Sequence, residues 1–319
     1  MRSARLVPRR YAVCAALACC AAGSAAAQEL NPRAYVISPV GTNAINLGYS
    51  YLVGNPDLSG GTPITDAHVS IDVAALGYYR AFDFFGRSAN VAVAIPYAVG
   101  DFSGLVAQAP RHAHRDGLLD SSLRLSVNLL GGPTMQPPEF LKWRQDVVLG
   151  ASLKIVAPTG QYDPTELVNL GTHRWAFKPE IGYSQRWNHW VLDGYAAVWF
   201  FTENPEFFSH NAYFPGVRSK TQSPITALEA HISYDVRPRL WLSLDANFWS
   251  GGEATVNGVA NPGSYQRASR VGLTASIPLS AHNSIKLSYS DGAYVRAAGG
   301  YRSISASWQY GWVGWPRFH

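Results

Sequence analysis

The side chains that could carry out chemistry in this chain are few and far apart. His231 and Ser233 lie two residues apart, as a general base and a nucleophile can, and His112 and His114 have a spacing that can bind a metal ion. Two imidazoles alone make a weak metal site. His231 and Ser233 fall on the polar face of a segment in which polar and apolar residues alternate. Such a placement is more typical of the polar face of a β-strand than of a catalytic pair. We therefore predict no enzyme activity, no catalytic residue, no metal site and no cofactor.

The first 27 residues contain all three cysteines and have the form of a signal peptide. Four arginines are followed by an apolar run and by a small-residue cleavage site that ends at Ala27. We predict that residues 1–27 are removed and that the mature chain, residues 28–319, has no thiol. The signal carries most of the net charge of +5, so the nearly neutral remainder gives no reason to expect nucleic-acid binding.

The remaining chain is built from segments in which apolar and polar side chains alternate. Within Leu119–Leu129, for example, Leu123 and Leu125 alternate with Arg124 and Ser126. A period of two places each set on one face of a β-strand. Twelve such segments are Asn43–Val53, His68–Phe82, Val91–Val99, Leu119–Leu129, Asp146–Ala157, Trp175–Trp187, Trp190–Thr202, Pro224–Val236, Leu240–Trp249, Arg270–Leu279, Ser284–Ser290 and Arg302–Trp312.

The connections between these segments alternate in length. Asn188–His189 is tight, whereas Gly100–Gly117 and Glu203–Ser223 are long. Short periplasmic turns and long external loops are typical of outer-membrane barrels, so the pattern predicts an all-β fold, a transmembrane antiparallel up-and-down β-barrel of about 12 strands in the bacterial outer membrane. Gly131–Trp143 is a long connection at the short-turn end, and it leaves the strand boundary there open.

Aromatic side chains near the strand ends predict a belt at the membrane interface. They are Tyr49, Tyr51, Phe82, Tyr97, Trp175, Trp187, Trp190, Phe248, Trp249, Trp308, Tyr310 and Trp312.

If the apolar faces meet lipid, the opposite faces enclose a lumen with charges of both signs. Its predicted residues are Asp72, Arg80, Arg124, Lys154, Glu180, Glu229, His231, Asp245, Arg270 and Lys286. Two interpretations are open, since these charges can pair and fill a small lumen or can select which solutes pass. In the long loop 203–223, Phe207, Phe208, Tyr213 and Phe214 can form an external vestibule for an aromatic solute or can pack on one another.

Five stretches have an order and spacing that match a known family. They are GTNAINLGYSYLVGN from Gly41, VAVAIPYAVGDFSG from Val91, APTGQYDPTELVNLGTHRW from Ala157, ALEAHISYDVRPRLWLSLDANFWSGG from Ala227 and SWQYGW from Ser307. Together they resemble the outer-membrane proteins of the MetA-pathway of phenol degradation family. The resemblance covers most of the mature chain. It implies a barrel that moves small hydrophobic or aromatic compounds, and it assigns no catalytic or binding residue.

The combined hypothesis is an outer-membrane channel for the passive passage of small hydrophobic or aromatic compounds. The alternative is a structural or surface-interaction barrel whose closed lumen passes nothing. The expected partners are outer-membrane lipid, the solute and the barrel assembly machinery. That machinery commonly recognises a terminal aromatic residue, and Phe318 lies one residue before the last position, so the assembly signal is imperfect. The sequence leaves the solute, the gating and the oligomeric state open.

Overall fold

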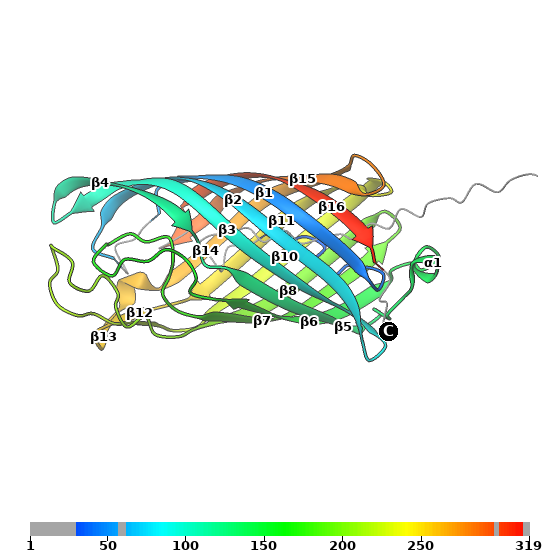
Figure 1. The fold of residues 1–319 in the computed structure, drawn as a ribbon, viewed down its shortest axis with the longest axis horizontal. Helices are drawn as coiled ribbons and strands as arrows, with labels where there is room; N and C mark the ends of the chain where they lie inside the picture. Colours follow the sequence, from blue (N-terminus) through cyan, green and yellow to red (C-terminus); the bar gives the residue numbers. More distant parts are fainter. Residues whose placement is uncertain (1–29, 57–61, 297–299, 315–319) are drawn as a thin grey trace, which may run out of the picture.

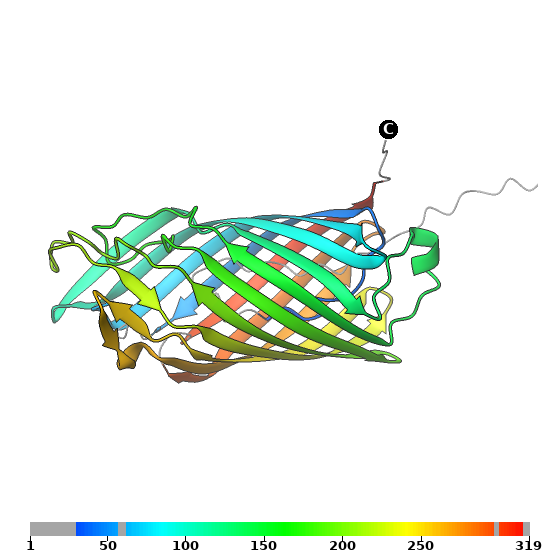
Figure 2. The same ribbon diagram turned by 90° about the horizontal axis from the view of Figure 1, so that it is seen from below.

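The computed structural model describes residues 30–56, 62–296 and 300–314, which form one β-barrel (Figure 1). The predicted signal peptide, its cleavage site and Phe318 lie outside the described residues. The barrel is a closed antiparallel sheet of 12 strands with one extra strand, which confirms the predicted all-β architecture. Viewed from below, the strands run at a tilt along the barrel (Figure 2).

Neighbouring barrel strands pair along their lengths, and the pairing of β2 with β3 closes the sheet on itself. Closure leaves no row of unpaired backbone groups to face lipid. The strands of this sheet are β1 (Thr42–Gly54), β2 (Thr65–Phe84), β3 (Arg87–Val106), β4 (Ala109–Leu118), β5 (Ser122–Leu130), β6 (Val147–Val156), β7 (Ala176–Trp187), β8 (Trp190–Phe201), β10 (Ile225–Arg237), β11 (Leu240–Gly251), β14 (Gln266–Pro278), β15 (Asn283–Arg296) and β16 (Tyr301–Val313).

The loop predicted at Gly100–Gly117 is wrong, because this stretch is a hairpin of β3 and β4 that extends the barrel wall outward. Its turn is Ala107-Gln108, with φ values of 50° and 65°, the left-handed pair that a tight two-residue hairpin turn requires. β3 pairs with β5 along its first half and with β4 along its second half. The outer part of the hairpin lacks a lipid-facing apolar pattern, so alternation did not reveal it.

The two ends of the barrel differ, as the connection lengths predict. At the long-loop end, β9 (Lys220–Gln222), β12 (Ala254–Val256) and β13 (Val259–Asn261) form a small separate sheet. The long connection at the opposite end holds the one-turn helix α1 (Pro137–Phe140), which begins at a capping box (Figure 1). No helix among the described residues is long and apolar enough to cross a membrane.

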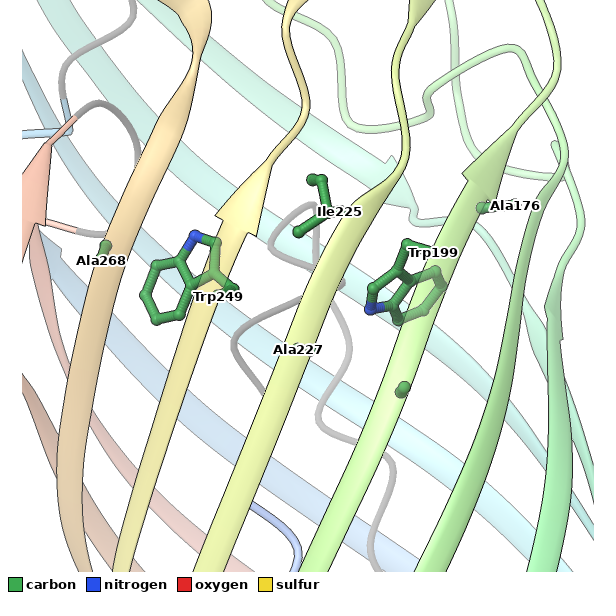
Figure 3. Packing of buried hydrophobic residues seen from close by; sticks show 7 residues of the cluster. Ala176, Trp199, Ile225, Ala227, Trp249 and Ala268 are labelled. Carbon is green, nitrogen blue, oxygen red and sulfur yellow. The ribbon is translucent and has the colours of Figure 1, made fainter.

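The outer face carries the predicted band of apolar side chains. Leu76, Ile95, Leu244 and Leu273 are exposed on it, and Trp175, Trp187, Trp190 and Tyr97 are exposed on the same face. Trp249 is an exception to the predicted belt, because it is fully buried and packs with Ile225 and Ala268 on the lumen side (Figure 3). Trp249 lies on the same face of β11 as Asp245 and Asn247, which are also buried.

Candidate solute path

The segment before β1 enters the barrel, and we call residues 30–41 the luminal segment. The backbone N–H of Arg33 donates to Asp193 Oδ2 at 3.1 Å, and that of Ala34 donates to the Tyr195 hydroxyl at 3.0 Å. The Tyr35 hydroxyl donates to Glu180 Oε1 at 2.9 Å. Sequence reasoning missed this segment, because it has no periodic pattern, and with it missed Asp193 and Tyr195.

Two wall glycines make room for the luminal segment. Gly150 of β6 and Gly182 of β7 stand directly opposite each other. A Cβ atom would lie 2.2 Å from the Tyr35 ring at Gly150 and 2.0 Å from it at Gly182. Only residues without a side chain allow the ring to sit at this depth, so the wall is shaped around the tyrosine.

The lower part of the luminal segment is packed against the long connection at the short-turn end. Ile37 and Tyr35 belong to one buried cluster with Met135, and Phe140 and Trp143 pack against it. The backbone N–H of Val40 donates to the Met135 carbonyl at 2.9 Å. This unusually long connection therefore provides apolar side chains that pack against the luminal segment.

An extended ion-pair network lines the wall beside Tyr35. Arg124 contacts Glu180 at 3.1 Å, and Lys178 bridges Glu180 at 2.8 Å and Glu229 at 3.0 Å. His231 lies 3.6 Å from Glu229 on the other side. The structure thus brings together four predicted lumen residues, Arg124, Glu180, Glu229 and His231. All four are buried.

The network continues to Asp245, a fifth predicted lumen residue. His231 Nδ1 lies 2.9 Å from Asp245 Oδ1. The hydroxyls of Ser243 and Thr274 each donate to this carboxylate at 2.6 Å. The charges therefore pair across neighbouring strands, as the first of the two sequence interpretations expects.

The lumen is nearly filled at the level of this network. A cavity of about 10 Å³ lies between Arg124, Lys154, Lys178 and Glu180, which is room for about one water molecule. The ammonium groups of Lys154 and Lys178 lie 6.0 and 5.7 Å from the ring centre of Trp199, a residue that sequence reasoning missed. Little free space therefore remains between these side chains.

Two further predicted lumen residues lie away from the network. Arg270 is buried and donates to Ser290 Oγ at 2.8 Å and to the Tyr301 carbonyl at 2.7 Å. Lys286 is half-buried and stands opposite the buried Ser307, which places it on the lumen face.

The prediction that Asp72 and Arg80 line the lumen is wrong, because both lie on the outer face of β2. Asp72 accepts a hydrogen bond from the hydroxyl of the exposed Tyr49, and Arg80 shares its face with the exposed Leu76. β2 carries apolar side chains on both faces, so its alternation alone does not distinguish inside from outside. The register of β2 with β1 distinguishes the two faces, since Leu76 stands opposite the lipid-facing Leu47.

The corrected orientation of β2 gives the lumen an apolar side. Val73 is buried in a cluster with Ala98, Leu119 and Leu170, and Ile71 packs against that cluster. The ion-pair network runs from β5 to β14 on the other arc of the wall. The lumen side of the wall therefore carries an apolar cluster on β2 and β3 and a charged network on β5 to β14.

The loop aromatics are divided between two roles. The rings of Phe207 and Phe208 lie 4.6 Å apart and those of Phe208 and Phe214 lie 5.9 Å apart, so these three pack on one another. Tyr213 instead lines an external cavity of about 310 Å³. Of the four predicted vestibule residues, Tyr213 lines this cavity.

Lys220 of β9 makes the external loops sensitive to pH. Its ammonium lies 4.4 Å from the Phe207 ring centre, and burial together with the charge of Arg174 lowers its pKa to about 7. Between this value and the ordinary pKa of 10.5, the unfolded chain binds the proton and the folded chain does not, so stability rises with pH in that window.

We therefore expect proteolysis of the loop 203–223 to be slower at about pH 9 than at about pH 6. Because proteases themselves depend on pH, the measured quantity is the cleavage rate relative to a Lys220→Met variant at each pH. Native and variant rates that keep one ratio at both pH values would contradict the assignment.

The fold is shared with a solved outer-membrane channel. The structure is similar to the COG4313 outer membrane channel from Pseudomonas putida F1, with a TM-score of 0.71 and 17% sequence identity over 89% of this chain and 100% of that one. The β domain of the Bordetella autotransporter BrkA has a TM-score of 0.48, with 10% identity over 85% and 100% of the two chains. The CymD monoaromatic hydrocarbon channel has a TM-score of 0.43, with 7% identity over 86% and 90%.

No curated protein matches the sequence. The family described as "Putative MetA-pathway of phenol degradation" matches residues 53–310, which is most of the chain. The match confirms the resemblance carried by the five stretches. The chain is an outer-membrane β-barrel, and it belongs to the MetA-pathway of phenol degradation family.

Proposed function

We propose that the chain is a channel for the passive passage of small hydrophobic or aromatic compounds, and that the structure holds it in a closed state. The observation that carries this proposal is that a segment of the chain itself lies inside the barrel. Beside the wall's ion-pair network, the lumen holds the chain's own segment 30–41, whose Tyr35 ring lies against two wall glycines. A segment that is held by a few hydrogen bonds and one apolar cluster can leave the lumen, whereas the side chains of a packed wall cannot.

The two-sided lumen supports this choice of solute. A compound with a ring and a polar group needs apolar contacts and hydrogen-bond partners, and the wall offers apolar residues such as Ile71 on β2 and polar groups on β5 to β14. A strongly hydrated solute would lose water along the apolar part of the wall and gain no hydrogen bonds there in return.

The polar pair His231 and Ser233 supports a channel without enzymatic activity. His231 is held by Asp245, while Ser233 Oγ accepts a hydrogen bond from Arg33 Nε at 2.8 Å. The serine is thus engaged by the luminal segment and not by the imidazole that would have to activate it.

The predicted cleavage after Ala27 is compatible with the same account. It would leave a short free N-terminus next to the luminal segment, which needs no second anchor to enter or leave the barrel. Removal of residues 1–27 and recognition of Phe318 by the assembly machinery remain predictions.

A second function, a structural barrel that passes nothing, is favoured by the small volume left beside the network. The test is uptake of a labelled alkylbenzene by a strain that lacks the protein, with and without complementation by the native chain. Faster accumulation in the complemented strain is expected for a channel. Equal accumulation in both strains, with the native chain detected in the outer membrane of the complemented strain, would favour the structural barrel.

A further inference from the structure

The external cavity of about 310 Å³ lies outside the nearly filled part of the lumen. It is bounded by the outward extension of β2, β3 and β4 and by two loops at the end that carries β12 and β13 (Figure 1). Its apolar lining includes Ile64, Phe102, Val106 and Leu167. Ile64 and Val106 are themselves buried in one cluster, so this lining is a fixed surface and not a chance gap between loops.

Two arginines on β4 reach the cavity, and they differ in their partners. Arg115 forms an ion pair with Glu166, and its Nε donates to the Val168 carbonyl at 3.0 Å. The guanidinium of Arg111 lies 5.1 Å from the ring centre of Tyr213 and has no carboxylate partner among residues 30–56, 62–296 and 300–314. The cavity therefore carries one uncompensated positive charge beside an aromatic wall.

We propose that this cavity binds single-ring aromatic carboxylates. An apolar cavity of about 150 Å³ is enough for a benzene ring, so about 310 Å³ holds a ring with a short substituent. The carboxylate meets Arg111, whose two parallel N–H groups match its geometry. The ring lies against Phe102, Val106 and the face of Tyr213.

The charge and the lining together exclude two other ligand classes. A neutral hydrocarbon would partly remove Arg111 from water and return no hydrogen bond to it. A small inorganic anion would satisfy the arginine but leave the apolar lining unfilled. This binding site goes beyond the proposed passage, since a ligand can occupy it whether or not it crosses the membrane.

The test is calorimetric titration of the full chain in detergent with 4-propylbenzoate and with its neutral counterpart, 4-propylbenzamide. We expect one saturable site for the acid and binding of the amide that is roughly tenfold weaker, the effect of one charge-assisted hydrogen bond. Arg111→Gln should bring the acid to the level of the amide. Arg237→Gln, at an exposed position near the short-turn end, should change neither affinity.

Equal affinities of acid and amide for the native chain would overturn the proposal without recourse to any variant. Unchanged binding of the acid by a folded Arg111→Gln variant would do the same. The result is also separable from passage, because a chain that binds the acid but does not speed uptake of alkylbenzenes refutes the channel and supports this site. Faster uptake of alkylbenzenes without selective binding of the acid would support the channel and refute this site.

Discussion

Replacing Gly182 by valine is expected to open the barrel. The new Cβ atom would lie 2.0 Å from the Tyr35 ring, and the two methyl groups beyond it need further space in the same direction. The strand itself accepts the change, since valine favours extended backbone. We expect the conflict to be relieved by expulsion of the luminal segment, which the hydrogen bonds of Arg33 and Ala34, the Arg33–Asp235 ion pair and the apolar cluster of Ile37 otherwise hold.

Single-channel recordings in planar bilayers measure this effect. We expect conductance to rise roughly tenfold, because an unblocked barrel of about 12 strands is wider than one filled by side chains. Gly194→Val is the matched control, since a Cβ atom at Gly194 meets nothing within 4 Å and the glycine lies in the neighbouring strand β8. A Gly182→Val channel with native conductance would show that the luminal segment does not close the pore.

The sequence predicted the barrel because lipid imposes a regular pattern on its outer face. Leu125, Ile181 and Leu244 are exposed where the alternation places them, and Arg124 and Glu180 face inward beside them. β2 was misread because an apolar lumen surface at Val73 removes the contrast between its two faces. The period of two identifies a strand, but only a difference in polarity between faces tells which one meets lipid.

The luminal segment could not be predicted for a different reason. Residues 30–41 bind through single contacts, such as Tyr35 to Glu180 and Arg33 to Asp235 at 2.7 Å, that have no repeat in the sequence. The only local signals are Gly150 and Gly182, and a glycine in a strand has several explanations. The filling of the lumen therefore becomes visible only once the register brings these two glycines together.

The luminal segment contacts the ion-pair network at Glu180 and Arg124. Glu180 accepts from Tyr35 and also pairs with Arg124 and Lys178. The guanidinium of Arg124 lies 5.0 Å from the Tyr35 ring centre. When the segment leaves, Glu180 keeps both cations, so the charged network survives opening and can line the open path.

Replacing Lys178 by methionine is expected to destabilise the barrel by about 3–5 kcal/mol, the usual cost of breaking a buried ion pair from one side. Lys178 is 4% exposed and contacts both Glu180 and Glu229. Without it, Arg124 still pairs with Glu180, and His231 lies 3.6 Å from Glu229. Lys154 stands directly opposite Lys178, and the relief of their repulsion offsets part of the loss.

Urea unfolding in lipid vesicles, followed by tryptophan fluorescence, measures the change. Lys286→Met removes a half-buried lumen lysine with no ion pair among the described residues, and should change stability by less than about 1 kcal/mol. The double variant Lys178→Met/Glu229→Gln should recover much of the loss, because removing both partners leaves no uncompensated charge. If Lys178→Met and Lys286→Met have the same stability, the network is an incidental filling of the lumen and does not stabilise the wall.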